Sequence, residues 1–270
     1  TQKPALTSAR IPEDKLLSTV DRSAALELLE QAYDLGEFKF GPQDTAWYQA
    51  VFATPADVEQ ALTVARRVNA ETFPKLAEQL GEFTTKVNFK PAETVEDWGT
   101  YLRLFVGIRE TLDRFVSDVF DRPLTELIAA TAPRKGADRT QMSGGNRRRL
   151  KKLAKEYLRT GMHVADMHVA LTAIQEQREL WQRFCTIPTS PQVPLGINDA
   201  LVSYQGFIGD LESLQVHLDP ESTEKPLVAL TLNELKLKLQ SLAEDTDALA
   251  NLGDRSLVMS RLREAGLGSL

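Results

Sequence analysis

The chain has 270 residues, of which 42% are hydrophobic and 26% charged, and its formal net charge is −6. This mix is typical of a folded, soluble protein with enough residues to bury a core in one large or two ordinary domains. No run of eighteen apolar residues occurs and the first twenty residues lack the order of a secretory signal, so we expect neither a membrane span nor secretion. The one cysteine, Cys185, can form neither an internal disulfide nor a cysteine-based metal site, which favours a cytoplasmic protein.

Residues that typically begin and end helices occur early in the chain. The segment after Asp21 ends at Gly36, where a glycine closes a helix well. The run Thr54-Pro55-Ala56-Asp57 combines a cap, a proline in the first turn and an acidic residue, and it predicts the start of a longer helix. Apolar residues then follow at steps of three and four as far as Val87, and we expect Pro74 to kink or restart this helix.

A second long helix is predicted after the turn at Lys90-Pro91. Thr94 and Asp97 have the spacing of a capping box, and an apolar stripe extends from there to Val119. Two such helices joined by a short loop most simply form an antiparallel hairpin. We therefore expect Phe105 and Leu112 to face the segment Val58–Val87.

The second half of the sequence has the same capping residues and apolar stripes with helical spacing. A capping box is predicted for Thr231 with Glu234, and short extended pieces only at Phe38–Phe40 and Val228–Leu230. Apolar stripes predict helices over residues 164–184, 201–218, 232–249 and 257–262. The predicted fold is all-α, an elongated helical bundle with long antiparallel coiled-coil-like hairpins. Its regions are a hairpin region (1–133), a basic loop with helices (134–187), a proline-rich connector (188–196) and C-terminal helices (197–270), or else one continuous bundle.

The segment from Arg134 to Arg159 has a strong surplus of positive charge. It holds ten basic residues against Asp138 and Glu156, a net charge of +8 in a chain of net charge −6. Such a concentration of one sign is the electrostatic footprint of a protein that binds a phosphate backbone. An acidic protein surface, or plain solvation, explains the same pattern. The candidate nucleic-acid contacts are Arg139, Arg147, Arg148, Arg149, Lys151, Lys152, Lys155 and Arg159.

Helical spacing predicts how these basic residues are presented. Arg147, Lys151 and Lys155 are four residues apart and would share one face, with Arg148, Lys152 and Arg159 beside them. The apolar positions that would point towards a core are Leu150, Leu153 and Leu158. Tyr157 is the only aromatic residue among the basic residues, so the pattern offers little support for base stacking.

No catalytic group is predicted. Met142-Ser143-Gly144-Gly145-Asn146 resembles the signature of ABC-type ATPases, but the phosphate-binding loop that must accompany it is missing, so Ser143 is better interpreted as a cap or turn residue. His163 and His168 would lie about 140° apart on a helix and would not converge on a metal. Trp47, Trp98 and Trp181 lie on apolar stripes and are expected in the core. We expect no cofactor in this segment.

The basic segment, from Arg134-Lys135-Gly136 through Arg149-Leu150-Lys151-Lys152, resembles part of large actinobacterial ATPases described as superfamily one DNA or RNA helicases. The segments Leu218–Thr223 and Leu239–Asp245 resemble the same proteins, so the likeness covers most of the chain. The resemblance implies an internal helical region of a longer polypeptide, with flanking ATPase domains as partners. ATP and magnesium would bind in that parent chain, which would be an ATP-dependent helicase.

Two hypotheses of different classes follow for the function. In the first, the chain is an accessory helical domain of a helicase-like ATPase, it contacts DNA or RNA through the basic helix, and it is not by itself an enzyme. In the second, the chain is a coiled-coil scaffold that binds a protein partner and touches no nucleic acid. Binding that weakens with salt would favour the first hypothesis.

Overall fold

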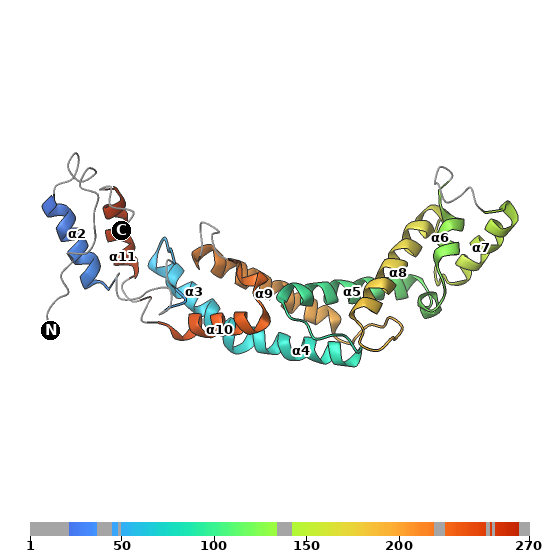
Figure 1. Ribbon diagram of the computed structural model, residues 1–270, viewed down its shortest axis with the longest axis horizontal. Coiled ribbons are helices and arrows are strands. Elements are labelled where there is room, and N and C mark those ends of the chain that lie inside the picture. The colour runs from blue at the N-terminus through green and yellow to red at the C-terminus, as the bar shows by residue number, and fades with distance from the viewer. Residues whose placement is uncertain are drawn as a thin grey trace. The chain divides into compact units, whose positions relative to one another are not determined.

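The computed structural model describes residues 22–36, 45–47, 50–133, 142–218, 225–246, 249 and 252–264. Within these ranges every regular element is a helix, and the isolated bridges include Phe89–Cys185 and Phe115–Leu158 (Figure 1). The prediction of an all-α fold is confirmed. Of the helices described, none has the length and apolar character needed to cross a bilayer.

The chain forms two compact units. Unit 1 combines Thr1–Phe73 with Phe207–Leu270, and unit 2 is the continuous segment Pro74–Gly206 between them. These boundaries differ from the region boundaries predicted at residues 133, 187 and 196. Unit 2 therefore contains the whole basic segment and the proline-rich connector, whereas unit 1 is assembled from both ends of the described chain.

In unit 1, the first described helix packs against the last. Helix α2 (Arg22–Asp34) lies beside α11 (Leu252–Glu264) (Figure 1). The contact buries small and branched side chains, namely Ala25, Ala32, Val258 and Leu262. Gly36 ends α2 with a φ of 86°, a left-handed conformation that suits glycine, as its position after the helix predicted.

A second helix pair of unit 1 joins α3 (Pro55–Arg67) to α10 (Leu232–Glu244). Both helices begin with capping boxes: Thr231 pairs with Glu234 as predicted, and Thr54, predicted as a cap, also pairs with Asp57. The hydrogen bonds from the Thr231 backbone and hydroxyl lower the pKa of the Glu234 carboxyl. Trp47 anchors the pair, since its indole Nε1 donates to the carbonyl of Leu242 at 3.0 Å.

The predicted disturbance at Pro74 takes the form of a π-helical turn. The chain runs from α3 into η1 (Val68–Thr72) and then into α4 (Phe73–Lys86). Proline has no N–H, and its ring clashes with the carbonyl four residues earlier in a regular α-helix. In the wider turn, Phe73 N–H donates to the carbonyl of Val68, five residues back. The α-helix therefore resumes at Phe73, directly after the π-helical turn.

The prediction of a short extended piece at Val228–Leu230 is wrong. The segment Leu227–Ala229 is a single 3₁₀ turn, η4, with Ala229 N–H bonded to the Pro226 carbonyl at 2.9 Å. Short-range bonds satisfy this backbone, so it needs no partner strand, and Leu227 anchors it by being buried. The other predicted extended piece, Phe38–Phe40, lies outside the described residues.

The core of unit 2 is aromatic. It forms where α5 (Val95–Arg114) and α8 (Val164–Phe184) pack against each other and against the loop before α5. The ring centroids of Phe89 and Trp181 are 4.5 Å apart, and Phe105 stacks on Phe89 at 5.5 Å. The indole Nε1 of Trp181 also donates to the Thr189 hydroxyl at 3.2 Å, which fastens the proline-rich loop to this core.

Of the two contacts predicted for α5, the structure shows the one made by Phe105. Phe105 meets Phe83 of α4 edge to face, with 6.4 Å between ring centroids, so the predicted contact of Phe105 with this segment is confirmed. Leu112 is wrongly placed by the prediction, since it is half-buried and faces Val193 and Pro194. Leu112 lies seven residues beyond Phe105, about 10.5 Å along the axis, where this loop covers α5 instead.

Gly99 of α5 packs closely against a side chain of another helix, and a substitution there tests this packing. A Cβ atom at Gly99 would lie 2.3 Å from the hydroxyl of Tyr204 on α9 (Ile197–Leu218), whereas a Cβ atom at Gly81 of α4 would meet nothing within 4 Å. Overpacking costs about 1–3 kcal/mol, more than the roughly 0.5–1 kcal/mol that alanine gains over glycine in a helix. We expect Gly99→Ala to destabilise the protein and Gly81→Ala to stabilise it in urea unfolding. A stabilising Gly99→Ala would show that Tyr204 does not pack there.

Candidate nucleic-acid interface

The basic helix is α7 (Gly144–Glu156), and Ser143 caps it. The Ser143 hydroxyl accepts the backbone N–H of Asn146 at 3.3 Å. This hydrogen bond satisfies one of the free donors of the first turn. The interpretation of Ser143 as a helix cap is confirmed.

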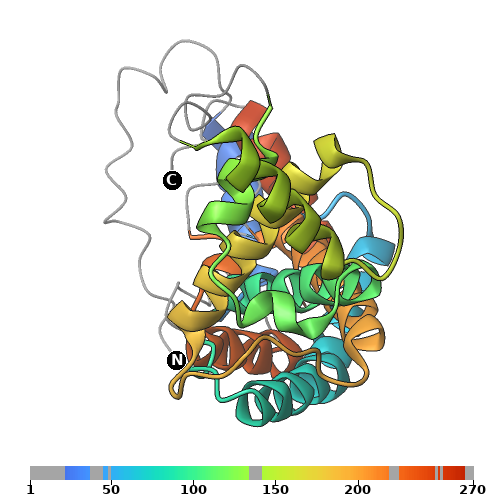
Figure 2. The ribbon, with the colours of Figure 1, turned by 90° about the vertical axis from the view of Figure 1, so that its right-hand side faces the viewer.

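Helix α7 packs on one side against α6 (Thr125–Thr131), which in turn packs on α8 (Figure 2). Leu150 is only 4% exposed and Ala154 is fully buried. The prediction that Leu153 points to the core is wrong, since it is 38% exposed, and Leu158 is half-buried. Leu150 and Ala154 lie 40° apart on the helix, whereas Leu153 lies 60° from Leu150 and 100° from Ala154.

The packing of α7 decides which cations face solvent. Arg148, Arg149, Lys152 and Lys155 are exposed, whereas Arg147 and Lys151 are half-buried. Arg147, Lys151 and Lys155 lie within an 80° sector of α7, as predicted, but Arg147 lies only 20° from buried Ala154 around the helix and is half-buried. The centre of the exposed surface is the set Arg148, Lys152 and Lys155, which falls within a 60° sector. We call this surface, with Arg149 and Lys151 at its edges, the cationic face.

The cationic face carries little compensating charge. Within the described part of the chain, none of its five side chains forms an ion pair, in contrast to Arg67, whose guanidinium lies 2.7 Å from the Asp210 carboxylate. The one acidic residue of α7 is Glu156. Exposed like charges on one helix face create a positive potential that attracts anions over about a Debye length.

The C-terminal end of α7 meets the end of α5. Val116 N–H donates to the Tyr157 carbonyl and Arg159 N–H to the Arg114 carbonyl, both at 2.8 Å. The Arg159 side chain also donates through Nε to the carbonyl of Phe115 at 3.1 Å, so this predicted contact has a structural role as well. Arg114 is exposed, and this backbone contact places it beside Arg159, which lies 45 residues later in the sequence. A local sequence pattern could not have predicted that Arg114 lies beside the basic segment. Arg139, the remaining candidate, lies outside the described residues.

His163 and His168 lie at the start and in the second turn of α8. Over the described residues no group of three His, Cys, Asp or Glu side chains is placed to hold a metal ion. His163 is exposed at the start of α8, and His168 lies 3.1 Å through Nδ1 from the carbonyl of Ile128. His168 therefore helps to join α8 to α6.

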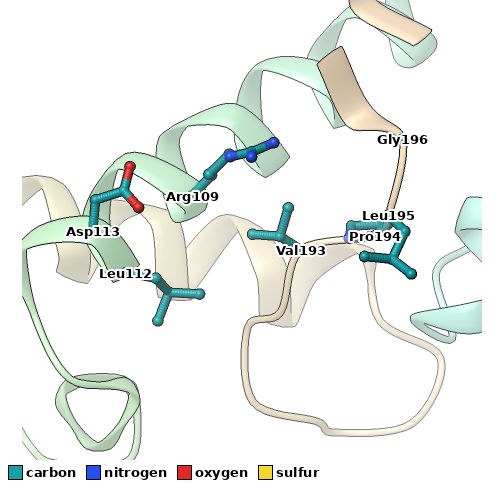
Figure 3. Close-up of a pocket in the computed structure, with 7 residues that line it drawn as sticks. All are labelled: Arg109, Leu112, Asp113, Val193, Pro194, Leu195 and Gly196. Atoms are coloured by element: carbon teal, nitrogen blue, oxygen red, sulfur yellow. The ribbon is translucent and has the colours of Figure 1, made fainter. Parts of the chain in front are cut away.

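The described residues also form a shallow groove in unit 2, with a volume of about 310 Å³. Arg109, Leu112 and Asp113 of α5 line one side, and the loop Val193–Gly196 lines the other (Figure 3). Arg109 donates to the Asn198 side chain at 3.3 Å. Asp113 is the one lining side chain that could act as an acid, a base or a nucleophile, and we assign no chemistry to the groove.

Two tyrosines of unit 2 have raised pKa values. Burial raises the pKa of the Tyr101 phenol, and the Asp97 and Glu93 carboxylates raise it further. Burial also raises the pKa of Tyr204, although Arg103 opposes this effect. Tyr101 donates to the Lys90 carbonyl at 3.0 Å, so its shift reflects packing rather than catalysis.

Comparison of the chain with protein-family models, with curated proteins and with solved structures finds no match.

Proposed function

We propose that this chain is an accessory helical module that contacts the phosphate backbone of nucleic acid through α7. The observation that carries the proposal is the cationic face, where five basic side chains share one side of a helix and none is in an ion pair within the described residues. Lysine and arginine that neutralise phosphates release counterions, and this release favours binding.

The wider proposal is that the module belongs to a helicase-like ATPase whose nucleotide-binding domains lie elsewhere in the parent chain. The resemblance of the basic segment to superfamily one helicases supports it. In this proposal the paired helices, including coiled-coil-like hairpins, act as a lever or spacer, and unit 2 presents α7 to DNA or RNA. ATP and magnesium would bind in the parent ATPase domains, in the cytoplasm.

A second candidate function is a scaffold that binds a protein partner. Unit 1 contains 13 basic and 22 acidic residues, a net charge of −9, and it therefore repels phosphate. Its helices also expose apolar side chains, among them Val216 of α9 and Leu237 of α10. Isolated apolar side chains are common on protein surfaces, so this candidate has less support than the cationic face gives the first.

The proposal is tested by replacing Arg148, Lys152 and Lys155 together with alanine. For a DNA duplex, losing three phosphate contacts should make the slope of log K against log salt shallower by about 2.7. We expect affinity at low salt to fall at least tenfold, measured by fluorescence anisotropy.

The matched control replaces Lys75, Lys90 and Arg183, three exposed cations of unit 2 outside α7, with alanine. It changes net charge equally and should leave the slope unchanged. Equal losses from both triple variants would mean that binding follows net charge and not α7. If the unmutated chain binds no nucleic acid at low salt, the scaffold is favoured.

A further inference from the structure

We infer that the cationic face binds the backbone of double-stranded nucleic acid in preference to single strands. This inference rests on the proposed function and narrows its ligand. It concerns the phosphate arrangement alone, which duplex DNA and duplex RNA both provide.

Among the described residues, the cationic face has no exposed aromatic side chain on which a base could stack. Proteins that hold single strands combine basic grooves with exposed aromatic side chains, and each stacked base contributes about 1–3 kcal/mol. Helix α7 itself contains no aromatic residue. Tyr157, just beyond its end, is half-buried, and the large aromatic side chains Phe105, Phe115 and Trp181 of unit 2 are fully buried.

A duplex also carries more negative charge per unit length than a single strand does. Arg148 and Lys155 are seven residues apart, so the centre of the cationic face extends about 10.5 Å along the helix axis. A duplex carries one phosphate per 1.7 Å of its axis, or about six in this length, whereas one strand carries about three. Along the length of the cationic face a duplex therefore carries about twice the phosphate charge of a single strand.

The first experiment compares ligands with the full chain. Fluorescence anisotropy would measure binding of three labelled 20-mers, namely a DNA duplex, an RNA duplex and single-stranded oligothymidine. At least one duplex should bind tenfold or more tightly than oligothymidine, and the two duplexes identify which source of backbone is preferred. Equal or tighter binding of oligothymidine would overturn the inference while leaving the proposed function standing, whereas failure to bind any of the three would overturn both.

A competition experiment separates nucleic acid from an acidic protein surface. Unlabelled poly-glutamate, added at a charge concentration equal to that of unlabelled duplex, should displace the labelled duplex far less well than duplex does. Equal displacement by poly-glutamate would overturn the inference, because any polyanion would then satisfy the cationic face.

A third experiment adds charge where the structure has room for it. A Cβ atom at Gly145 would meet nothing within 4 Å. Gly145→Glu places a carboxylate in the first turn of α7, three and four residues before Arg148 and Arg149. Acidic residues are favourable in a first helical turn, and glutamate is a better helix former than glycine, so the melting temperature should stay or rise. Duplex affinity should nevertheless fall about tenfold.

The matched control is Gly81→Glu, at a helical glycine of α4 with equally open space. It gives the same change in net charge in the same unit, and duplex affinity should be nearly unchanged. If Gly145→Glu binds duplex as well as the unmutated chain does, the cationic face is not the binding surface.

Discussion

Replacing Trp181 with alanine is expected to reduce the free energy of unfolding of unit 2 by about 3–5 kcal/mol. Trp181 is fully buried, and its ring contacts Phe89 and Phe105 in the aromatic core. Alanine would leave a large cavity that neighbouring helices can fill only in part. It would also remove the Nε1 hydrogen bond to Thr189, so the loop that runs from α8 to α9 would lose a tether. Urea unfolding followed by circular dichroism measures the loss.

Trp181→Phe is the matched control, because it keeps an aromatic ring and removes the hydrogen bond. We expect it to cost clearly less than the alanine substitution, with about 1 kcal/mol assigned to the lost hydrogen bond. A loss below about 1 kcal/mol for Trp181→Ala would contradict the placement of this side chain at the centre of unit 2.

Elements that depend on neighbouring residues could be predicted from the sequence. Thr94 and Thr231 form the predicted capping boxes, and Thr54, predicted as a cap, also has an acidic residue three positions later and forms one. The disturbance at Pro74 was also predictable, since it follows from the chemistry of proline. These features need no knowledge of what packs against the helix.

The arrangement between distant segments could not be predicted in the same way. An apolar stripe shows that a helix has a buried face, but it does not identify the partner, so the contact of α2 with α11 left no signal in the sequence. The same limit explains Leu112, whose partner is the loop at Val193 and Pro194 instead of the preceding helix. The division into units after Phe73 and Gly206 falls within or beside helical residues, where composition does not change.

The candidate site was predictable as a basic helix but not as a surface. Charge counting identified the cations, whereas their orientation depends on Leu150 and Ala154 packing towards α6. That packing leaves Arg147 and Lys151 half-buried and centres the exposed surface on Arg148, Lys152 and Lys155. It also leaves Leu153 at the edge, although a leucine in a helix normally indicates a core position.

The contrast between Leu150 and Leu153 yields a prediction that joins stability to function. Leu150→Ala should cost about 2–5 kcal/mol, because it removes the main apolar anchor of α7 on α6. Duplex affinity should fall with it, although no cation is changed, since a helix that detaches from α6 no longer holds its cations in one sector. Urea unfolding and fluorescence anisotropy on the same samples measure the two effects.

Leu153→Ala is the matched control on the neighbouring face of the same helix. Its side chain is 38% exposed, so we expect a cost within about 0.5 kcal/mol, in the range of ordinary surface substitutions, and an unchanged duplex affinity. Equal costs for the two leucines would contradict the packing of α7 described above. If Leu150→Ala destabilises the protein and leaves duplex affinity intact, the cations do not need the folded platform of α6, and nucleic acid itself would have to order α7.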